Sequence, residues 1–116
     1  MSKKTQLFET PPYAVEQSLT RLGADLRTAR VRRKLTISDV AEKIGTGVRA
    51  IADAEKGKIS TGIGVYIALL WTYGLLDQMN EVAEPARDLE GQRLALSREN
   101  VRARSGNIKG EIDNDF

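Results

Sequence analysis

The sequence predicts an all-α protein. Alternation of apolar and polar residues with a period of two, the pattern typical of half-buried strands, is not sustained anywhere along the 116 residues. Apolar residues instead recur every three or four positions, as on helices that bury one face. The clearest stretch is residues 35–58, LTISDVAEKIGTGVRAIADAEKGK, which predicts two short helices joined by a tight turn, a helix-turn-helix. Apolar residues make up 41% of the chain, enough for one small core.

The beginning of the chain predicts an arm followed by a long helix. Residues 1–11 are largely polar, and we expect a disordered N-terminal arm that ends at Pro11 and Pro12. Proline suits the first turn of a helix, so a helix is expected from Pro12 to about Arg33. One face of this helix carries Val15, Leu19, Leu22, Leu26 and Ala29. Gly23 lies within the helix and should weaken it without ending it.

The first short helix of the helix-turn-helix has both a start signal and a stop signal. Thr36 is followed three residues later by Asp39, which predicts a capping box at the N-terminus of the helix. Gly45 stands where the left-handed residue that ends a helix is expected. The apolar face between these ends consists of Val40, Ala41 and Ile44.

The second short helix is expected to begin at Gly47, after the turn at Thr46-Gly47, and to end at Gly57. Its packed face is predicted from residues at i, i+3, i+4 and i+7, which are Val48, Ile51, Ala52 and Glu55. In a helix-turn-helix the second helix presents its outer face to the DNA major groove while the first helix braces it against the backbone. The expected partner is therefore double-stranded DNA.

A further helix is predicted after a loop over residues 57–64. Residues 65–73 are apolar on nearly all sides, which indicates a buried helix at the centre of the bundle, capped by Gly74. Its aromatic residues are expected to lie in the core or in a dimer interface, and they are Tyr66, Trp71 and Tyr73.

The C-terminal part predicts two more helical segments. A short helix is expected from Leu75, ending before Pro85, so that residues 12–84 form one domain. A last helix is expected in residues 85–104, as a C-terminal extension of that domain. Residues 105–116 are rich in Gly, Asn and Asp, and we expect them to form a flexible tail.

Charge is distributed unevenly along the chain, although the net charge is only +2. Residues 21–58 hold ten basic and five acidic residues, whereas residues 59–90 hold one basic and five acidic residues. The basic part coincides with the predicted helix-turn-helix, as binding to phosphates requires. An ordinary solvated face on a helical protein is the alternative explanation of the charge.

The composition excludes several classes of function. The chain has no cysteine and no histidine, which removes thiol and histidine catalysis, disulfides and Cys/His metal sites. Its glycines match no phosphate-binding loop, and no apolar run has membrane-spanning length or forms a signal-peptide core. We therefore expect a cytoplasmic protein that is not an enzyme, located at the nucleoid when bound to DNA. No cofactor, metal ion, small-molecule ligand or membrane is expected as a partner.

A set of positions across the helix-turn-helix carries a family resemblance: Arg30, Leu35, Thr36, Ala41, Ile44, Gly45, Ile51, Glu55, Gly57 and Lys58. Their order and spacing strongly resemble the phage-repressor family, the Cro/CI-type or XRE family, over roughly residues 22–76. The resemblance implies a five-helix lambda-repressor-like DNA-binding domain, here with a C-terminal helical extension. It also implies a structural ion pair between Arg30 and Glu55, which ties the long helix to the recognition helix.

The resemblance also implies which residues meet the DNA. Carried over by position, Val48, Arg49 and Asp53 face the groove, and Ile37 stands where the family usually has glutamine. The complete set of expected DNA contacts is Thr36, Ile37, Thr46, Gly47, Val48, Arg49, Asp53, Lys56 and Lys58.

The chain departs from the family at several of these positions. The usual polar side chains are replaced by Ile37, Gly47, Val48 and Ala50. Arg49 remains a strong direct reader, suited to guanine, while Val48 suits a thymine methyl group and Asp53 a cytosine amino group. We therefore expect weaker DNA binding than that of a phage repressor, and a degenerate motif used for protein contact is the alternative.

The second half carries a narrower resemblance. Gly74-Leu75-Leu76-Asp77 follows the apolar helix, and an acidic segment with Pro85 and a basic helical tail come next. This order resembles the C-terminal part of Hip-type (HipB-like) antitoxins. The resemblance implies a homodimer that represses its own operon and binds a HipA-like serine/threonine kinase toxin. A plain dimeric XRE-family regulator without a toxin is the alternative.

Two surfaces are expected from this resemblance and from the distribution of residues. The acidic residues expected to contact the kinase are Asp77, Glu81 and Glu84, because phosphate would repel them from DNA. The apolar residues expected to join two protomers are Leu75, Leu76, Met79, Leu89 and Leu94.

Overall fold

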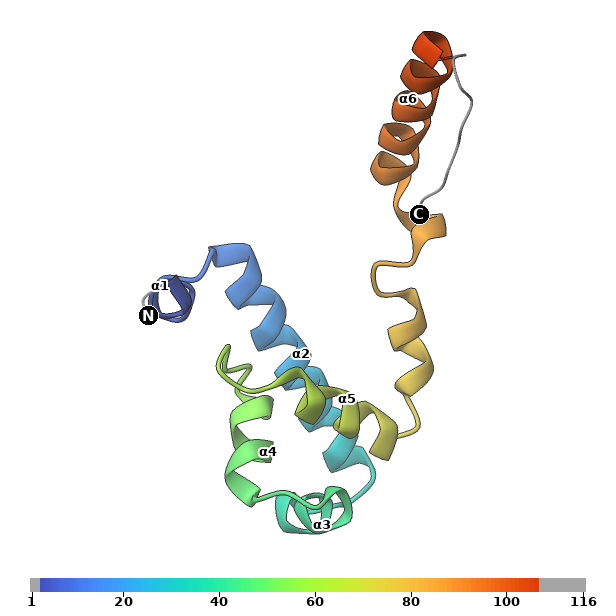
Figure 1. Cartoon of the computed structure of the whole chain (residues 1–116). Coiled ribbons are helices and arrows are strands. Elements are labelled where there is room, and N and C mark those ends of the chain that lie inside the picture. The colour runs from blue at the N-terminus through green and yellow to red at the C-terminus, as the bar shows by residue number, and fades with distance from the viewer. Residues whose placement is uncertain (1–2, 107–116) are drawn as a thin grey trace. The chain divides into compact units, whose positions relative to one another are not determined.

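The computed structural model describes residues 3–106, and within this range all regular elements are helices (Figure 1). The predicted all-α class is confirmed. The chain divides into two compact units, Met1–Met79 and Asn80–Phe116, and each is treated by itself. Most of the predicted flexible tail, residues 107–116, lies outside the described residues.

The first unit contains the predicted bundle. Its helices are α1 (Lys3–Glu9), α2 (Tyr13–Arg32), α3 (Ile37–Ile44), α4 (Val48–Glu55) and α5 (Ile63–Thr72), followed by the 3-10 helix η1 (Leu76–Glu81) at the boundary of the two units. α4 packs against α2, α3 and α5, and α3 also packs against α5. The short helix expected from Leu75 is thus present as the 3-10 helix η1.

The expectation of a disordered N-terminal arm is wrong for residues 3–9, which form α1. The segment KKTQLFE contains several residues with high helix propensity and neither glycine nor proline. Thr10 closes the C-terminal end of this helix, because its backbone N–H and its hydroxyl both donate to the carbonyl of Gln6, at 2.9 and 3.1 Å. The polar composition of the segment concealed these local signals.

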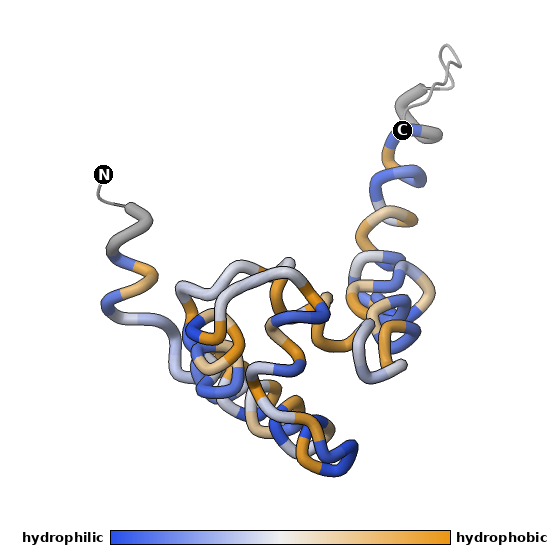
Figure 2. Tube along the Cα trace, turned by 90° about the horizontal axis from the view of Figure 1, so that it is seen from below, coloured by the Kyte–Doolittle hydropathy of each residue, from blue (hydrophilic) through white to orange (hydrophobic). Residues whose placement is uncertain are grey.

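The core of the first unit is built from every helix between α2 and α5. Its members are Leu26, Ala29, Val40, Ala41, Ile51, Ala54, Tyr66, Leu69, Leu70 and Tyr73. Figure 2 shows hydrophobic and hydrophilic residues alternating along these helices, as expected when each buries one face. The predicted apolar face of α3 is present, and that of α2 is present from Leu19 to Ala29, but Val15 is 40% exposed. The largest fully buried side chains are Leu26, Val40, Ile51 and Leu69.

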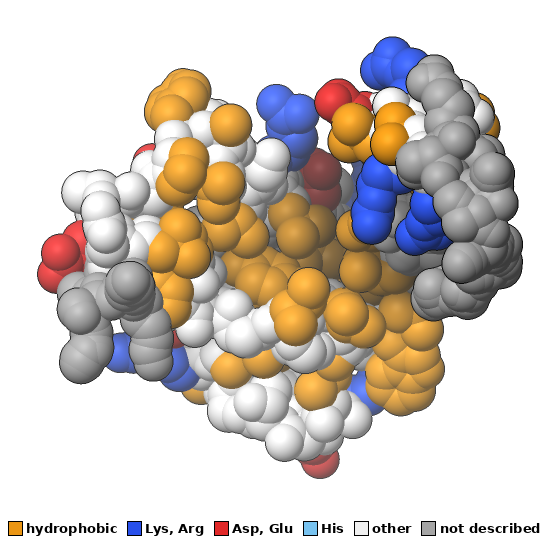
Figure 3. Space-filling view, turned by 45° about the horizontal axis from the view of Figure 1, so that its top comes forward, with side chains coloured by type: hydrophobic (Ala, Val, Ile, Leu, Met, Phe, Trp, Pro, Cys, Tyr) orange, Lys and Arg blue, Asp and Glu red, His pale blue; other side chains and the backbone are white. Residues whose placement is uncertain are grey.

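The prediction that α5 is buried on nearly all sides is wrong for one of its faces. Tyr66, Leu69 and Leu70 are buried, but Trp71 is 55% exposed. Ile63, which was predicted to lie in the preceding loop, is the first residue of α5 and is 67% exposed. The physical reason is the size of the bundle, because α5 has only α3 and α4 as major packing neighbours. Hydrophobic side chains accordingly reach the surface, as on the face shown in Figure 3.

The second unit contains the 3-10 helix η2 (Pro85–Arg87) and the helix α6 (Leu89–Gly106). α6 begins later than predicted because Asp88 acts as its N-cap: the backbone N–H of Gly91 donates to Asp88 Oδ1 at 2.9 Å. α6 also runs into the predicted tail, since Gly106 is its last residue. Its apolar side chains Leu89 and Leu94 are 67% and 59% exposed.

Candidate nucleic-acid interface

The helix α3 begins and ends where the sequence predicts. The hydroxyl oxygen of Thr36 accepts from the backbone N–H of Asp39, and Asp39 Oδ2 accepts from the backbone N–H of Thr36, both at 2.9 Å. These two hydrogen bonds form the predicted capping box, and the bond from the Thr36 backbone N–H holds the pKa of Asp39 below its ordinary value. Gly45 ends α3 with a φ of 88°, the left-handed conformation expected at this position.

The helix α4 is joined to α2 by the ion pair that the family resemblance implies. Arg30 Nε lies 2.6 Å from Glu55 Oε2, and a second guanidinium nitrogen lies 3.0 Å from Glu55 Oε1. The remaining terminal nitrogen donates to the carbonyl of Leu35 at 2.9 Å. Both side chains are nearly buried, and the hydrogen bonds to Glu55 raise the pKa of Arg30. Because two hydrogen bonds join the side chains, the pair fixes the orientation of the guanidinium relative to the carboxylate as well as the distance between them.

Two glycines allow the C-terminal end of α4 to touch the backbone of α2. A Cβ atom at Gly23 would lie 2.6 Å from the carbonyl oxygens of Ala54 and Glu55. Gly57, just after α4, has a φ of 71°, and a Cβ atom there would collide with the backbone of Leu19 and Thr20. Gly23 was expected only to weaken α2, and the structure instead gives it a packing role.

Four basic residues are clustered at the end of α2: Arg30, Arg32, Arg33 and Lys34. Two of them form hydrogen bonds with other groups of the protein. Arg30 binds Glu55, and Arg33 donates to the carbonyls of Ala29 and Tyr73, each at 2.9 Å. The Arg33 guanidinium also lies over the Tyr73 ring, 5.5 Å from its centroid. Arg33 therefore links the C-terminal ends of α2 and α5 although it is exposed, as are Arg32 and Lys34; Arg30 is the buried member of this cluster.

A shallow hollow lies between the N-terminal end of α3 and the outer face of α4. It is lined by Leu35, Thr36 and Ile37 on the α3 side and by Val48, Arg49 and Ala52 on the α4 side. The structure thus brings four of the predicted DNA contacts together. Val48 and Arg49 are exposed, and Val48 keeps 53% of its surface accessible.

The other predicted DNA contacts lie around this hollow or at the end of α4. Thr46 is half-buried in the turn, and Gly47 is exposed as the N-cap of α4. Asp53 is half-buried, and its Oδ1 lies 3.6 Å from the Nζ of Lys58. Lys56 is exposed. The Lys58 ammonium compensates part of the negative charge of Asp53, but a partly exposed pair of this kind is weak.

The predicted packed face of α4 is wrong in part. Ile51 and Ala54 are the buried residues, whereas Val48 is exposed and Ala52 is half-buried. The exposure of Val48 is compatible with the groove-facing position that the resemblance implies. Sequence reasoning missed the contribution of Leu35, Ser38 and Ala52 to the hollow. Ala52 lies one turn after Val48, so its spacing is the signal that places it on the same side of α4.

Of the acidic residues expected to bind a kinase, Asp77 belongs to the first unit, and Glu81 and Glu84 belong to the second. Asp77 and Glu81 are exposed, and Glu84 is half-buried. Arg87 pairs with Glu81 at 3.5 Å and with Glu84 at 3.3 Å. Exposed ion pairs of this kind are weak and leave the carboxylates open to another partner.

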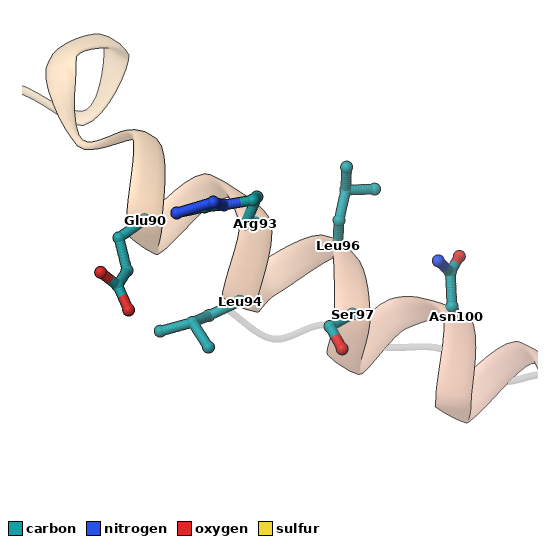
Figure 4. A pocket seen from close by; sticks show the side chains of 6 residues that line it. All are labelled: Glu90, Arg93, Leu94, Leu96, Ser97 and Asn100. Carbon is teal, nitrogen blue, oxygen red and sulfur yellow. The ribbon is translucent and has the colours of Figure 1, made fainter.

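An open pocket on α6 is formed by one helix alone. Figure 4 shows its lining residues, with Leu94 and Leu96 pointing to opposite sides of the helix. Side chains that diverge in this way do not enclose a ligand.

Among the described residues, no group of acidic side chains is placed to hold a metal ion. Within residues 3–106, no helix has both the length and the apolar character needed to cross a membrane.

A protein-family model matches the central part of the chain. Residues 21–82, which include the whole of α3, α4 and α5 and most of α2, match the model of a family described as "Helix-turn-helix domain". No curated protein and no solved structure matches the chain.

Proposed function

Because the chain belongs to the helix-turn-helix domain family, we propose that it is a sequence-specific DNA-binding transcriptional repressor with α4 as its recognition helix. The observation that carries this proposal is the exposed pair Val48 and Arg49 at the start of α4, next to the N-terminal end of α3. In helix-turn-helix proteins the N-terminal residues of the second helix reach the base edges. The Arg49 guanidinium is suited to donate two hydrogen bonds to guanine, at O6 and N7.

The rigidity of α4 supports this role. The Arg30–Glu55 pair and the contact of Gly23 with the end of α4 hold the helix against α2 at its C-terminal end. A side chain on a helix held in this way keeps its direction in the absence of DNA, which lowers the entropy lost on binding. Basic residues near α4 supply contacts to phosphate, and the hydroxyl hydrogen of Thr36 remains able to donate to a phosphate oxygen.

Selection from a library of random DNA duplexes tests the proposal. Purified protein is incubated with the library, and the bound duplexes are amplified and sequenced over several rounds. We expect one enriched site, bound more tightly than a random duplex at two salt concentrations, since specific contacts add to the salt-dependent phosphate contacts. A folded protein that enriches no site would contradict sequence-specific binding and would favour a helix-turn-helix used for protein contact.

A homodimer is the second part of the proposal. One eight-residue recognition helix makes few base contacts, and related architectures place two such helices about one DNA turn, ~34 Å, apart. Leu75 and Met79 already pack against the protomer core, so the proposed interface relies on Leu76, Leu89 and Leu94. Their exposure supports a role outside the protomer, because exposed apolar side chains are commonly covered in an assembly.

A HipA-like kinase toxin is the proposed protein partner, and autorepression of a shared operon is the proposed role. Support comes from the Hip-type resemblance of the second half and from the separation of charge. The acidic residues Asp77, Glu81 and Glu84 lie outside α3 and α4 in the sequence. They suit a protein partner better than DNA, because phosphate repels carboxylates.

Charge reversal separates the two proposed surfaces. A variant with Asp77, Glu81 and Glu84 each changed to Lys should lose the kinase and keep its affinity for DNA within a few-fold. Affinity capture of the tagged full chain from its native host, followed by mass spectrometry, is the measurement for the kinase. Capture that never recovers a kinase, together with the absence of a kinase gene beside this one, would contradict the antitoxin role. A plain autoregulatory repressor would then remain.

A further inference from the structure

The hollow between α3 and α4 is lined mainly by carbon. Leu35 and Ile37 form its wall on the α3 side, and Val48 and Ala52 form its wall on the α4 side. Val48 is the most exposed of the branched apolar residues that line it, at 53%. An apolar surface of this kind lies where the proposed function brings the protein closest to the bases. The chemistry of the hollow therefore limits which base edge it accepts.

Two of the four polar side chains at the rim of the hollow, Arg30 and Thr36, already have partners. Arg30 binds Glu55 and the carbonyl of Leu35, and the oxygen of Thr36 accepts from the backbone of Asp39. Among the described residues, Ser38 and Arg49 are the rim side chains without a hydrogen bond or ion pair. A base that pressed an amino group or a carbonyl into the hollow itself would leave that group unpaired and out of water.

A methyl group has no such requirement. In the major groove the methyl group at C5 of thymine is the apolar feature of the base edges, and 5-methylcytosine carries a methyl group at the same position. Burial of one methyl group contributes about fourfold in affinity. The hollow offers contact to this group from both helices, since Ile37 and Val48 approach it from opposite walls.

We propose that the hollow is a specificity pocket for the C5 methyl group of a pyrimidine, and that Arg49 binds the guanine of an adjacent base pair. The recognised element is a pyrimidine with a C5 methyl group next to a guanine. The apolar side chains of the hollow contact the methyl group, and the Arg49 guanidinium donates two hydrogen bonds to the guanine. Val48 and Arg49 are both exposed and both line the hollow at the N-terminal end of α4, so a duplex seated there would present neighbouring base pairs to the two side chains. This inference rests on the proposed DNA-binding function.

The test uses the site enriched from the random library. Each thymine of that site is replaced in turn by uracil, which removes the methyl group and keeps every hydrogen-bonding atom. We expect uracil in place of one particular thymine of each half-site to lower the affinity about fourfold. That thymine lies next to the guanine that Arg49 binds. A 5-methylcytosine, paired with guanine, in place of the same thymine should restore the affinity.

Variants of the protein show whether the hollow receives the methyl group. Val48→Ala should bind the thymine and uracil forms of the site with nearly equal affinity, because the wall on the α4 side is lost. Val31→Ala is the matched control, since Val31 is 49% exposed on α2 and does not line the hollow. The control should keep the fourfold preference for thymine. Unfolding curves of both variants verify that each remains folded.

Three results would overturn the inference. Equal affinity for thymine and uracil at every position would remove the methyl contact and leave sequence-specific binding intact. A thymine preference that is undiminished in both Val48→Ala and Ile37→Ala would assign the effect to DNA shape and not to the hollow. A library that yields no enriched site would overturn the proposed function, and this inference with it.

Discussion

Arg30 and Glu55 form a two-point ion pair, with nitrogen–oxygen distances of 2.6 and 3.0 Å, between the long helix α2 and the last residue of α4. The side chains keep only 11% and 6% of their surface exposed. The pair therefore connects α4 to α2 at the end of α4 opposite Val48 and Arg49. Its loss would affect both the stability of the domain and the direction of α4.

We expect Glu55→Ala to lower the free energy of unfolding by about 3–5 kcal/mol, because it leaves the Arg30 guanidinium buried without a counter-charge. Replacing Arg30 and Glu55 together by Leu and Met should cost less than Glu55→Ala alone. Glu55→Gln is the matched control, since it keeps an oxygen acceptor and removes only the charge. Urea unfolding followed by circular dichroism measures all three, and a loss below about 1 kcal/mol for Glu55→Ala would contradict the structural role.

Gly23→Ala should destabilise the domain by about 1–3 kcal/mol, because its Cβ atom would press on the carbonyl oxygens of Ala54 and Glu55. Gly64→Ala in α5 is the control. A Cβ atom at Gly64 meets nothing within 4 Å, so this change should stabilise α5 by about 0.5–1 kcal/mol. Thermal and urea unfolding show whether each variant lowers or raises the free energy of unfolding. Equal effects of the two variants would show that α2 and α4 do not need to approach so closely.

Arg49→Ala should cost about 1–3 kcal/mol in binding to the selected site and much less on a random duplex, since it removes a contact to a base. Lys58→Ala should weaken binding to both duplexes alike and reduce the salt dependence, as expected when a phosphate contact is lost. Titration of both variants against both duplexes at two salt concentrations gives the comparison. Equal losses on the two duplexes for Arg49→Ala would remove it from the base-reading role.

The capping box should make part of the stability depend on acid pH. The folded-state pKa of Asp39 is lowered, chiefly by the hydrogen bond from the Thr36 backbone N–H, so its contribution is complete above the unfolded-state pKa, about 4. That contribution is lost as the pH falls through the lower folded-state pKa. The difference in unfolding free energy between the natural chain and Asp39→Ala should therefore shrink between pH 7 and pH 3. A constant difference would contradict this assignment.

Sedimentation at micromolar concentration should show a dimer. Leu89→Glu combined with Leu94→Glu should shift it to a monomer, because charged side chains cannot be buried unpaired in an apolar interface. Val31→Glu is the control, since it places the same charge on an exposed valine of α2 that lies outside the proposed interface. A natural chain that sediments as a monomer would defeat the proposal, and a dimer that survives both leucine changes would move the interface elsewhere.

The features predicted correctly from the sequence depend on short-range signals. The limits of α3 follow from Thr36, Asp39 and Gly45. The hydrogen bonds between Thr36 and Asp39 join residues three positions apart, and the backbone N–H of Gly45 donates to the carbonyl of Ala41, four positions earlier. The all-α class follows from periodicity, which is likewise local. The error at α1 has the same origin, because a polar segment with high helix propensity resembles a disordered one in composition.

The sequence by itself determined that two short helices follow a long one, that Arg49 stands on the second of them, and that a glycine ends the first. Only the tertiary structure decided which side of α4 is buried. Several apolar stripes fit a helix of eight residues, and the choice among them is made by partners far away in the sequence. Arg30 is 25 residues from Glu55, and Gly23 meets the same end of α4. These contacts turn Ile51 and Ala54 inward and leave Val48 and Arg49 at the surface, because α4 has one orientation that satisfies the ion pair and the close backbone contact together.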